Sequence, residues 1–162
     1  MQPVYIGLGS NLAGAMGEPV EQLKQALETL ATHSQITLVN LSSNYRTKAI
    51  GPGAQPDYIN AAALIETQLD PLDLLDQLQF IEQQHDRERG IRWGARTLDL
   101  DMLMYGNLTI NSPRLTIPHP RIADRAFVLA PLLDLNPDLS LPDGQSVAKL
   151  LANCPEQGIF RL

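Results

Sequence analysis

The chain has 162 residues and a net charge of −6, which suits one folded domain spanning residues 1–162 and argues against non-specific nucleic-acid binding. Hydrophobic residues make up 44% and charged residues 19% of the sequence, which excludes a disordered chain, and no apolar run reaches the roughly 18 residues that a membrane helix needs. Because it has no basic leader and a single cysteine, Cys154, the sequence predicts a cytoplasmic protein without an internal disulfide.

The first 69 residues predict three strands and one helix. Residues 3–11, an apolar segment that ends in Gly, Ser and Asn, predict a strand that runs into a loop. Residues 36–47 and 57–69 are rich in strand-forming residues, and a loop with two prolines and two glycines separates them. A helix is expected over residues 18–33, with an apolar stripe formed by Val20, Leu23, Leu27 and Leu30.

Residues 70–90 carry the strongest helix pattern. Asp70 is a favourable N-cap residue, Pro71 suits the first helical position, and Gly90 can end the helix. Asp73 stands where a capping box places an acid. The buried stripe is predicted to consist of Leu72, Leu75, Leu78 and Ile81.

Residues 97–106 predict the next strand, which completes the order strand, helix, strand, strand, helix, strand. That order indicates an α+β fold with a ferredoxin-like βαββαβ core, in which helices pack on one face of an antiparallel sheet. A C-terminal extension follows this core. Within it, short extended pieces are expected over residues 107–122, and helices over 123–135 and 146–154.

The segment RTLDLDMLMYG, residues 96–106, places two acids inside a predicted strand. Since side chains alternate along a strand, Asp99 and Asp101 share one face, where their charges repel unless a cation lies between them. Oxygen ligands favour Mg²⁺, and no paired His or Cys ligands lie nearby, so the two acids predict a site for two magnesium ions. The opposite, core-facing side of the strand is expected to consist of Leu98, Leu100, Met102 and Met104.

Seven arginines and no lysine lie between residues 87 and 125, against four acids, which gives this segment a local charge of +3. Arginine suits multidentate recognition of phosphate better than lysine does. Acids that hold Mg²⁺ beside arginines that hold phosphate are the parts of a phosphoryl-transfer site, with a nucleoside triphosphate as the expected partner. The sequence lacks the P-loop motif with its lysine, which excludes a P-loop enzyme.

The segment RWGARTLDLDML, residues 92–103, resembles the hallmark segment of the 6-hydroxymethyl-7,8-dihydropterin pyrophosphokinase family. Further blocks resemble that family in the same order, up to about residue 144: YIGLGSNL, SSNYRT, GPGAQPDYINAA and RLTIPHPRIADRAFVLAPL. The resemblance implies a ferredoxin-like fold and a role in folate biosynthesis. It also implies transfer of an intact pyrophosphoryl group from ATP to the hydroxymethyl oxygen of the pterin, with release of AMP and a requirement for two Mg²⁺ ions.

The same resemblance implies the site residues. Asp99 and Asp101 would hold the metal ions, and the catalytic set would also include Arg87, Arg89 and Arg96. The ATP-binding residues would be Gln79, Glu82, Arg89, Trp93, Arg96, Arg114, Thr116, His119 and Arg125. The pterin-binding residues would be Thr47, Ile50, Tyr58, Asn60, Trp93 and Phe127. The expected partners are ATP and the pterin, with no nucleic acid or membrane, and the enzyme is expected to be a monomer.

Two alternative functions use the same residues. A ferredoxin-like nucleotide- or RNA-binding module without catalysis would display aromatic side chains on its sheet, yet aromatic residues make up only 5% of this chain. A two-metal nuclease or phosphatase would need a positioned water or a further metal-binding carboxylate. RNA binding that survives EDTA would favour the first alternative, and phosphate release from ATP without pterin would favour the second.

Overall fold

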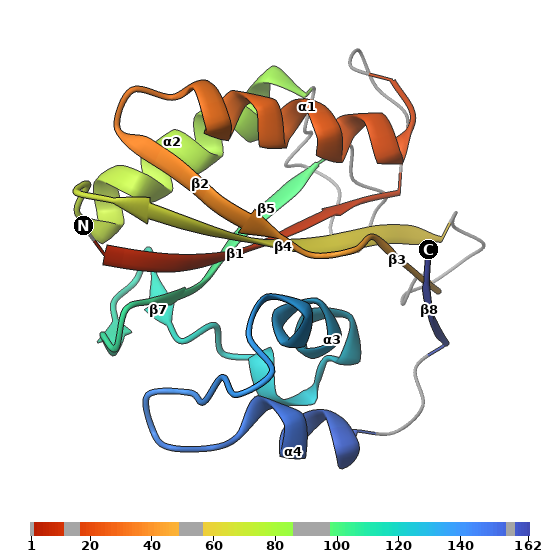
Figure 1. Ribbon diagram of the computed structural model, residues 1–162. Coiled ribbons are helices and arrows are strands. Elements are labelled where there is room, and N and C mark those ends of the chain that lie inside the picture. Colours follow the sequence, from red (N-terminus) through yellow and green to blue (C-terminus); the bar gives the residue numbers. More distant parts are fainter. Residues whose placement is uncertain (1, 12–16, 49–56, 86–97, 155–157) are drawn as a thin grey trace.

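The computed structural model describes residues 2–11, 17–48, 57–85, 98–154 and 158–162. Within these ranges six strands form one antiparallel sheet, with helices on both of its faces (Figure 1). The strands of this sheet are β1 (Gln2–Ser10), β2 (Ile36–Leu41), β3 (Tyr45–Thr47), β4 (Tyr58–Thr67), β5 (Asp99–Tyr105) and β8 (Ile159–Arg161). The helices are α1 (Pro19–Thr32), α2 (Pro71–Gln84), α3 (Ala126–Leu135) and α4 (Val147–Ala152). Between β5 and α3 the chain forms β6 (Ile110–Asn111), β7 (Thr116–Ile117) and the 3-10 turn η1 (Ile122–Asp124).

The strand order is β5–β1–β4–β3–β8, and β2 also pairs with β4. If β2 and β3 are counted as one interrupted strand, they lie beside β4, as the second strand of a ferredoxin-like sheet does. The predicted βαββαβ core is therefore confirmed. The interruption falls at Ser42, whose backbone N–H donates to the Ala62 carbonyl oxygen at 2.8 Å. The Ser42 hydroxyl oxygen accepts from the Ala62 N–H at 2.8 Å. The Ser42 side chain therefore maintains hydrogen bonding to β4 at the position where the strand is interrupted.

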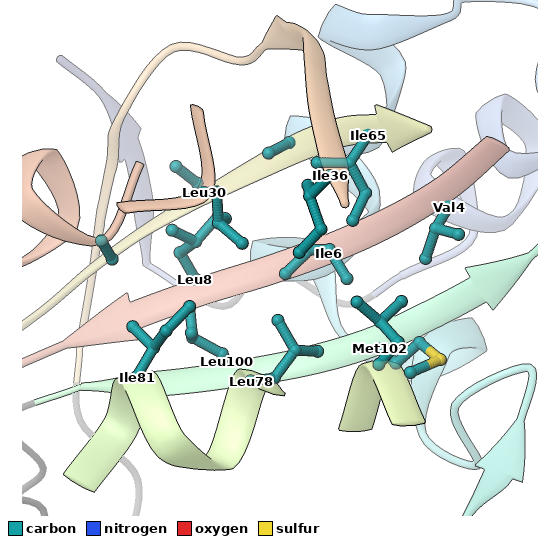
Figure 2. Close-up of a cluster of buried hydrophobic side chains, with 14 of the residues drawn as sticks. Val4, Ile6, Leu8, Leu30, Ile36, Ile65, Leu78, Ile81, Leu100 and Met102 are labelled. Atoms are coloured by element: carbon teal, nitrogen blue, oxygen red, sulfur yellow. The ribbon is translucent and has the colours of Figure 1, made fainter. Parts of the chain in front are cut away.

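Helices α1 and α2 cover one face of the sheet, and the first core lies between them and the strands (Figure 1). Figure 2 shows Leu78 and Ile81 of α2 directed toward the sheet beside Leu100 of β5. The predicted apolar stripe of α2 is wrong at one position, because Leu74 is fully buried whereas Leu72 is 45% exposed. The helical repeat that buries Leu78 and Ile81 places Leu74 on the same side, and it turns Leu72 toward solvent.

The helix ends agree with the predicted caps only in part. Asp70 is the N-cap residue of α2 and Pro71 begins the helix, as predicted, but the Asp70 side chain makes no capping hydrogen bond. The helix ends at Gln84, and the predicted stop at Gly90 lies outside the described residues. In α1, Val20 of the predicted stripe is 45% exposed, and the buried positions are Gln22, Leu23, Ala26 and Leu30.

Helices α3 and α4 cover the opposite face of the sheet, where a second core lies (Figure 1). Leu129 and Leu132 of α3 and Val147 of α4 are fully buried there. The expectation of helices on one face is therefore incomplete: the C-terminal extension turns the sheet into the middle of three layers. The physical reason is that the second face of the sheet is also apolar and has to be shielded from water.

The alternation predicted for β5 breaks at a β-bulge. Tyr5 pairs with Met104, whereas Ile6 pairs with Met102, so Leu103 is an extra residue in the ladder. Leu103 and Met104 both belong to the second core, whereas Met102 belongs to the first. The prediction that Met104 lies on the same face as Met102 is therefore wrong, because the bulge reverses the alternation after Leu103.

Strand β8 was not predicted from the sequence. It pairs antiparallel with β3 and extends the sheet beyond β3 (Figure 1). The short extended pieces and the two helices expected in the C-terminal extension are confirmed as β6, β7, α3 and α4. Among the described residues, no helix combines the length and the apolar character that crossing a membrane would require.

Candidate active site

A cavity of about 350 Å³ lies between the sheet and α3, on the side of the second core. Residues from β1, β3, β4 and β5 line it on the sheet side, and residues from η1 and the start of α3 line the other side. Of the residues implied by the family resemblance, those that line the cavity are Thr47, Tyr58, Asn60, Asp99, Asp101, Arg125 and Phe127. The fold thus brings together side chains from segments more than 70 residues apart.

The floor of the cavity is made of small residues on the two central strands. Gly7 and Gly9 of β1 lie directly opposite Asp101 and Asp99 of β5. On the other side of β1, Gly7 pairs with Ala62 and Gly9 pairs with Asn60. Since paired residues share a face of the sheet, the two glycines line the cavity with the two acids on one side of β1 and Asn60 on the other.

The two acids lie on one face of β5, as the strand alternation predicts. Asp99 is half-buried and Asp101 is exposed, and both line the cavity together with Leu103. No group of three or more His, Cys, Asp or Glu side chains within the described ranges could hold a metal ion. Two carboxylates nevertheless fit magnesium, because Mg²⁺ is usually held by one or two carboxylates together with substrate phosphates and water.

The wall opposite the acids presents an amide, a hydroxyl and two aromatic rings. Buried Asn60 donates from Nδ2 to the Thr47 hydroxyl oxygen at 2.8 Å, so this amide is fixed in orientation. Tyr58 belongs to β4 and Phe127 to α3, and both line the cavity. The Arg125 guanidinium carbon lies 5.5 Å from the centre of the Phe127 ring, which places a positive charge over the aromatic face.

Three cavity residues carry charge but were not assigned a role from the sequence: Lys48, Arg121 and Asp124. Arg121 and Asp124 form an exposed ion pair, with 3.7 Å between Nε and Oδ2. Arg121 is one of the seven arginines between residues 87 and 125, and this excess of arginine was the sequence feature that could have identified Arg121 as a site residue. Nothing in the sequence distinguished Lys48 or Asp124 from other surface charges.

His119 lies next to the cavity and does not line it. Its backbone N–H donates to the Leu103 carbonyl oxygen at 3.0 Å, and its Nδ1 accepts from the Arg121 N–H at 3.2 Å. Burial of the ring lowers the pKa of His119, and the positive charges of Arg125 and Arg121 lower it further. At neutral pH the ring is therefore uncharged, and since Nδ1 accepts a hydrogen bond, the ring proton is on Nε2.

The other residues implied for ATP binding lie outside the cavity. Arg114 donates from Nη2 to Asp76 Oδ1 at 2.6 Å and to Gln79 Oε1 at 3.5 Å, so it joins the segment between β6 and β7 to α2. Thr116 belongs to β7, where it pairs with Asn111. These contacts cluster around α2 and β7, beside the strand that carries the two acids.

Glu82, a residue implied for ATP binding, is buried rather than solvated on the surface of α2. Its Oε2 accepts from the Leu100 N–H at 2.9 Å, and this bond fixes β5 between the two acids to α2. The helical repeat that buries Leu78 and Ile81 places Glu82 on the same side of α2. Its bond could not be predicted, because the partner is a backbone group 18 residues away.

The Glu82→Ala variant is expected to be less stable than the parent protein by about 1–3 kcal/mol, because it leaves the buried Leu100 N–H without its acceptor. Urea unfolding followed by circular dichroism measures this free energy. Glu82→Gln retains an acceptor oxygen and should lose less. Equal unfolding free energies for the alanine variant and the parent would contradict the structural role of this bond.

Five implied residues lie outside the described residues: Ile50, Arg87, Arg89, Trp93 and Arg96. The three arginines implied for catalysis, Arg87, Arg89 and Arg96, are among them, so their contribution stays a prediction.

Comparison with known sequences gives consistent matches. A family model described as 7,8-dihydro-6-hydroxymethylpterin-pyrophosphokinase (HPPK) matches residues 5–137. A 2-amino-4-hydroxy-6-hydroxymethyldihydropteridine pyrophosphokinase from Pseudomonas aeruginosa is 49% identical over 162 residues, which cover 100% of this chain and 98% of that protein. The protein of the same name from Haemophilus influenzae is 48% identical over 162 residues, covering 100% of this chain and 99% of its relative.

Comparison with solved structures shows the same fold. The crystal structure of wild-type HPPK-DHPS from Plasmodium falciparum with pterin and p-hydroxybenzoate matches 93% of this chain, with a TM-score of 0.71 and 14% sequence identity. The match spans 42% of that longer chain. At this identity the likeness concerns the fold, which agrees with the sheet order and helix layers described above.

Proposed function

The chain belongs to the 7,8-dihydro-6-hydroxymethylpterin-pyrophosphokinase family, and on that premise we propose how its residues perform the reaction. The protein transfers a pyrophosphoryl group from ATP to 6-hydroxymethyl-7,8-dihydropterin in folate biosynthesis. The products are AMP and the pterin diphosphate. The observation that supports this most directly is the cavity itself, in which Asp99 and Asp101 lie across a glycine floor from Asn60.

The pterin fits the wall formed by β3, β4 and α3. Tyr58 and Phe127 would pack against the flat ring, and Asn60 would bond to the polar edge of the ring. Because Thr47 already holds the Asn60 amide, this partner is oriented before the substrate arrives. Pre-orientation of this kind lowers the entropic cost of binding. Ile50 and Trp93 are proposed to complete the pterin site.

The triphosphate fits the opposite side, along β5. Asp99 and Asp101 would hold two Mg²⁺ ions, which would neutralise the negative charge of the phosphates. Arg125 would bind a phosphate from the far wall, and His119 Nε2–H would donate to another. The remaining residues proposed for the nucleotide and the transferred group are Gln79, Glu82, Arg87, Arg89, Trp93, Arg96, Arg114 and Thr116.

With both substrates in place, the reaction is a single in-line displacement. The hydroxymethyl oxygen attacks the β-phosphorus of ATP, and its proton is released to water. The bond between that phosphorus and the oxygen shared with the α-phosphate breaks, and AMP leaves with the electron pair. The contribution of this chain is to hold the two reacting atoms close together and to stabilise the charge that develops.

The test is a turnover assay with ATP, MgCl₂ and 6-hydroxymethyl-7,8-dihydropterin, in which nucleotide products are separated by ion exchange. We expect AMP to form only when the pterin and magnesium are both present. Formation of ADP would refute pyrophosphoryl transfer. Release of inorganic phosphate without pterin would instead support the two-metal nuclease or phosphatase alternative.

The binding-module alternative is less well supported. The sheet face that lines the cavity carries two acids and two glycines where an RNA-binding sheet would present stacking rings. We propose that the protein works as a monomer in the cytoplasm, with residues 1–162 as one domain. Size-exclusion chromatography with light scattering, at a mass near 17.8 kDa, tests the oligomeric state.

Titration of His119 gives a direct check of the phosphate side. Its pKa is lowered in the free protein, because the ring is buried beside Arg125 and Arg121. Binding of ATP brings negative charge next to the ring, so the pKa of His119 is expected to rise when the nucleotide binds. The NMR shift of the His119 ring proton, followed against pH with and without magnesium and a non-hydrolysable ATP analogue, measures this change. A pKa that does not move would argue against contact between His119 and phosphate.

A further inference from the structure

The cavity wall that carries Thr47 depends on a very short strand. β3 has three residues and pairs on one side with β4, where Tyr45 lies opposite Asn60. On its other side it pairs with β8, where Tyr45 lies opposite Arg161. Without β8, β3 would be the edge of the sheet and three residue pairs alone would hold it, although it carries part of the proposed pterin site.

A single carboxylate reinforces this arrangement from α3. Asp134 Oδ2 accepts from the Tyr45 hydroxyl at 2.9 Å and from the Ser43 N–H at 3.1 Å. The Arg161 guanidinium lies 3.8 Å from Asp134 Oδ1 and donates to the Ser43 hydroxyl oxygen, at 3.1 Å from Nε and 3.0 Å from Nη2. We call these side chains the Asp134 network; its members are Ser43, Tyr45, Asp134 and Arg161.

The Asp134 network joins the two walls of the cavity. Asp134 belongs to α3, the helix that also carries Phe127, and Tyr45 belongs to β3, the strand that also carries Thr47. The Asp134 side chain is only 18% exposed, so its hydrogen bonds are shielded from water. The spacing between Phe127 and Thr47 is therefore fixed by bonds made outside the cavity, since no member of the network lines it.

We propose that the Asp134 network positions the pterin-binding wall of the cavity without touching either substrate. By holding β3 against α3, it keeps the Thr47 hydroxyl where it can orient the Asn60 amide. The two acids lie on β5, separated from β3 by two strands, so the triphosphate side should be little affected. The inference rests on the proposed function, because it takes the Asn60 wall as the pterin side.

A positioning role and a merely structural one predict different kinetics. Loss of general stability would reduce the amount of active enzyme and leave both Michaelis constants unchanged. Loss of positioning should raise KM for the pterin and leave KM for ATP unchanged. The ratio of the two KM changes is therefore the quantity to measure, together with the dissociation constant of the pterin by calorimetry.

The test compares Asp134→Ala with Asp134→Asn, which retains an acceptor oxygen for Tyr45 and Ser43. We expect the alanine variant to raise KM for the pterin about fivefold or more, with KM for ATP within about twofold of the parent, because a shielded hydrogen-bond acceptor is lost. The asparagine variant should recover most of the pterin affinity. Phe160→Ala is the matched control, because Phe160 lies on β8 beside Arg161 and is 59% exposed, and it should change neither constant.

Tyr45→Phe provides a second route if Asp134→Ala does not fold. It removes only the hydroxyl that donates to Asp134, and it should raise KM for the pterin in the same direction by a smaller factor. Folded variants that bind the pterin as the parent does, or that raise both KM values equally, would overturn the positioning role. Failure of the parent protein to produce AMP would instead overturn the proposed function, so the two failures are distinguishable.

Discussion

Replacing Asp99 or Asp101 with alanine is expected to lower the rate of AMP formation by about two to three orders of magnitude. Each carboxylate would hold Mg²⁺ ions, which would stabilise the charge of the transition state by several kcal/mol. Both side chains line the cavity from one face of β5. Circular dichroism of both variants checks that the activity is lost in folded protein. Turnover assays over a range of magnesium concentrations measure the effect.

Asp138→Ala is the control for this pair. Asp138 is exposed in the loop after α3, away from the cavity, so its loss changes the net charge by the same amount. Its turnover should equal that of the parent protein. An Asp99→Ala enzyme with nearly full activity at ordinary magnesium concentrations would contradict the proposed metal site, and so would an Asp101→Ala enzyme with that property.

Gly9→Ala is expected to weaken pterin binding by about tenfold, whereas Gly7→Ala should have a much smaller effect. A Cβ atom at Gly9 would lie 2.8 Å from Asn60 Oδ1, which is too close for the amide to stay in place. Asn60 is held by Thr47, so it can move only by giving up a buried hydrogen bond. At Gly7 the added atom would meet Leu103 at 3.4 Å, which is an ordinary contact.

Calorimetric titration with the pterin measures both glycine variants. They add the same methyl group to the same strand and the same face, so the difference between them isolates the displacement of Asn60. Equal loss of affinity in the two variants would mean that the methyl group acts by reducing the volume of the cavity. Unchanged pterin affinity in the Gly9→Ala variant would contradict a role for Asn60 in pterin binding.

The sequence predicted those features that depend on local patterns. The order of strands and helices followed from hydrophobic spacing, and the shared face of Asp99 and Asp101 followed from strand alternation. The family resemblance then identified residues on four strands and two helices, seven of which line one cavity. The glycine floor was not predicted, because it depends on which residue of β1 pairs with which residue of β5.

The features that the sequence did not predict depend on contacts between distant residues. The bulge at Leu103 follows from the pairing with β1, and single-strand alternation cannot reveal it. The hydrogen bond of Glu82 depends on Leu100, and β8 depends on a partner strand more than 110 residues earlier in the chain. Three residues of ordinary strand propensity, such as Ile159–Arg161, carry too little local signal to be assigned.

The sheet divides the apolar interior into two halves, and the cavity lies on the side of the sheet that α3 and α4 cover. Repacking side chains beneath α1 and α2, such as Leu30 or Leu74, would therefore alter thermal stability while leaving pterin recognition intact. In this architecture, thermal stability and pterin selectivity can be adjusted separately, because a layer of backbone hydrogen bonds lies between the residues responsible for each.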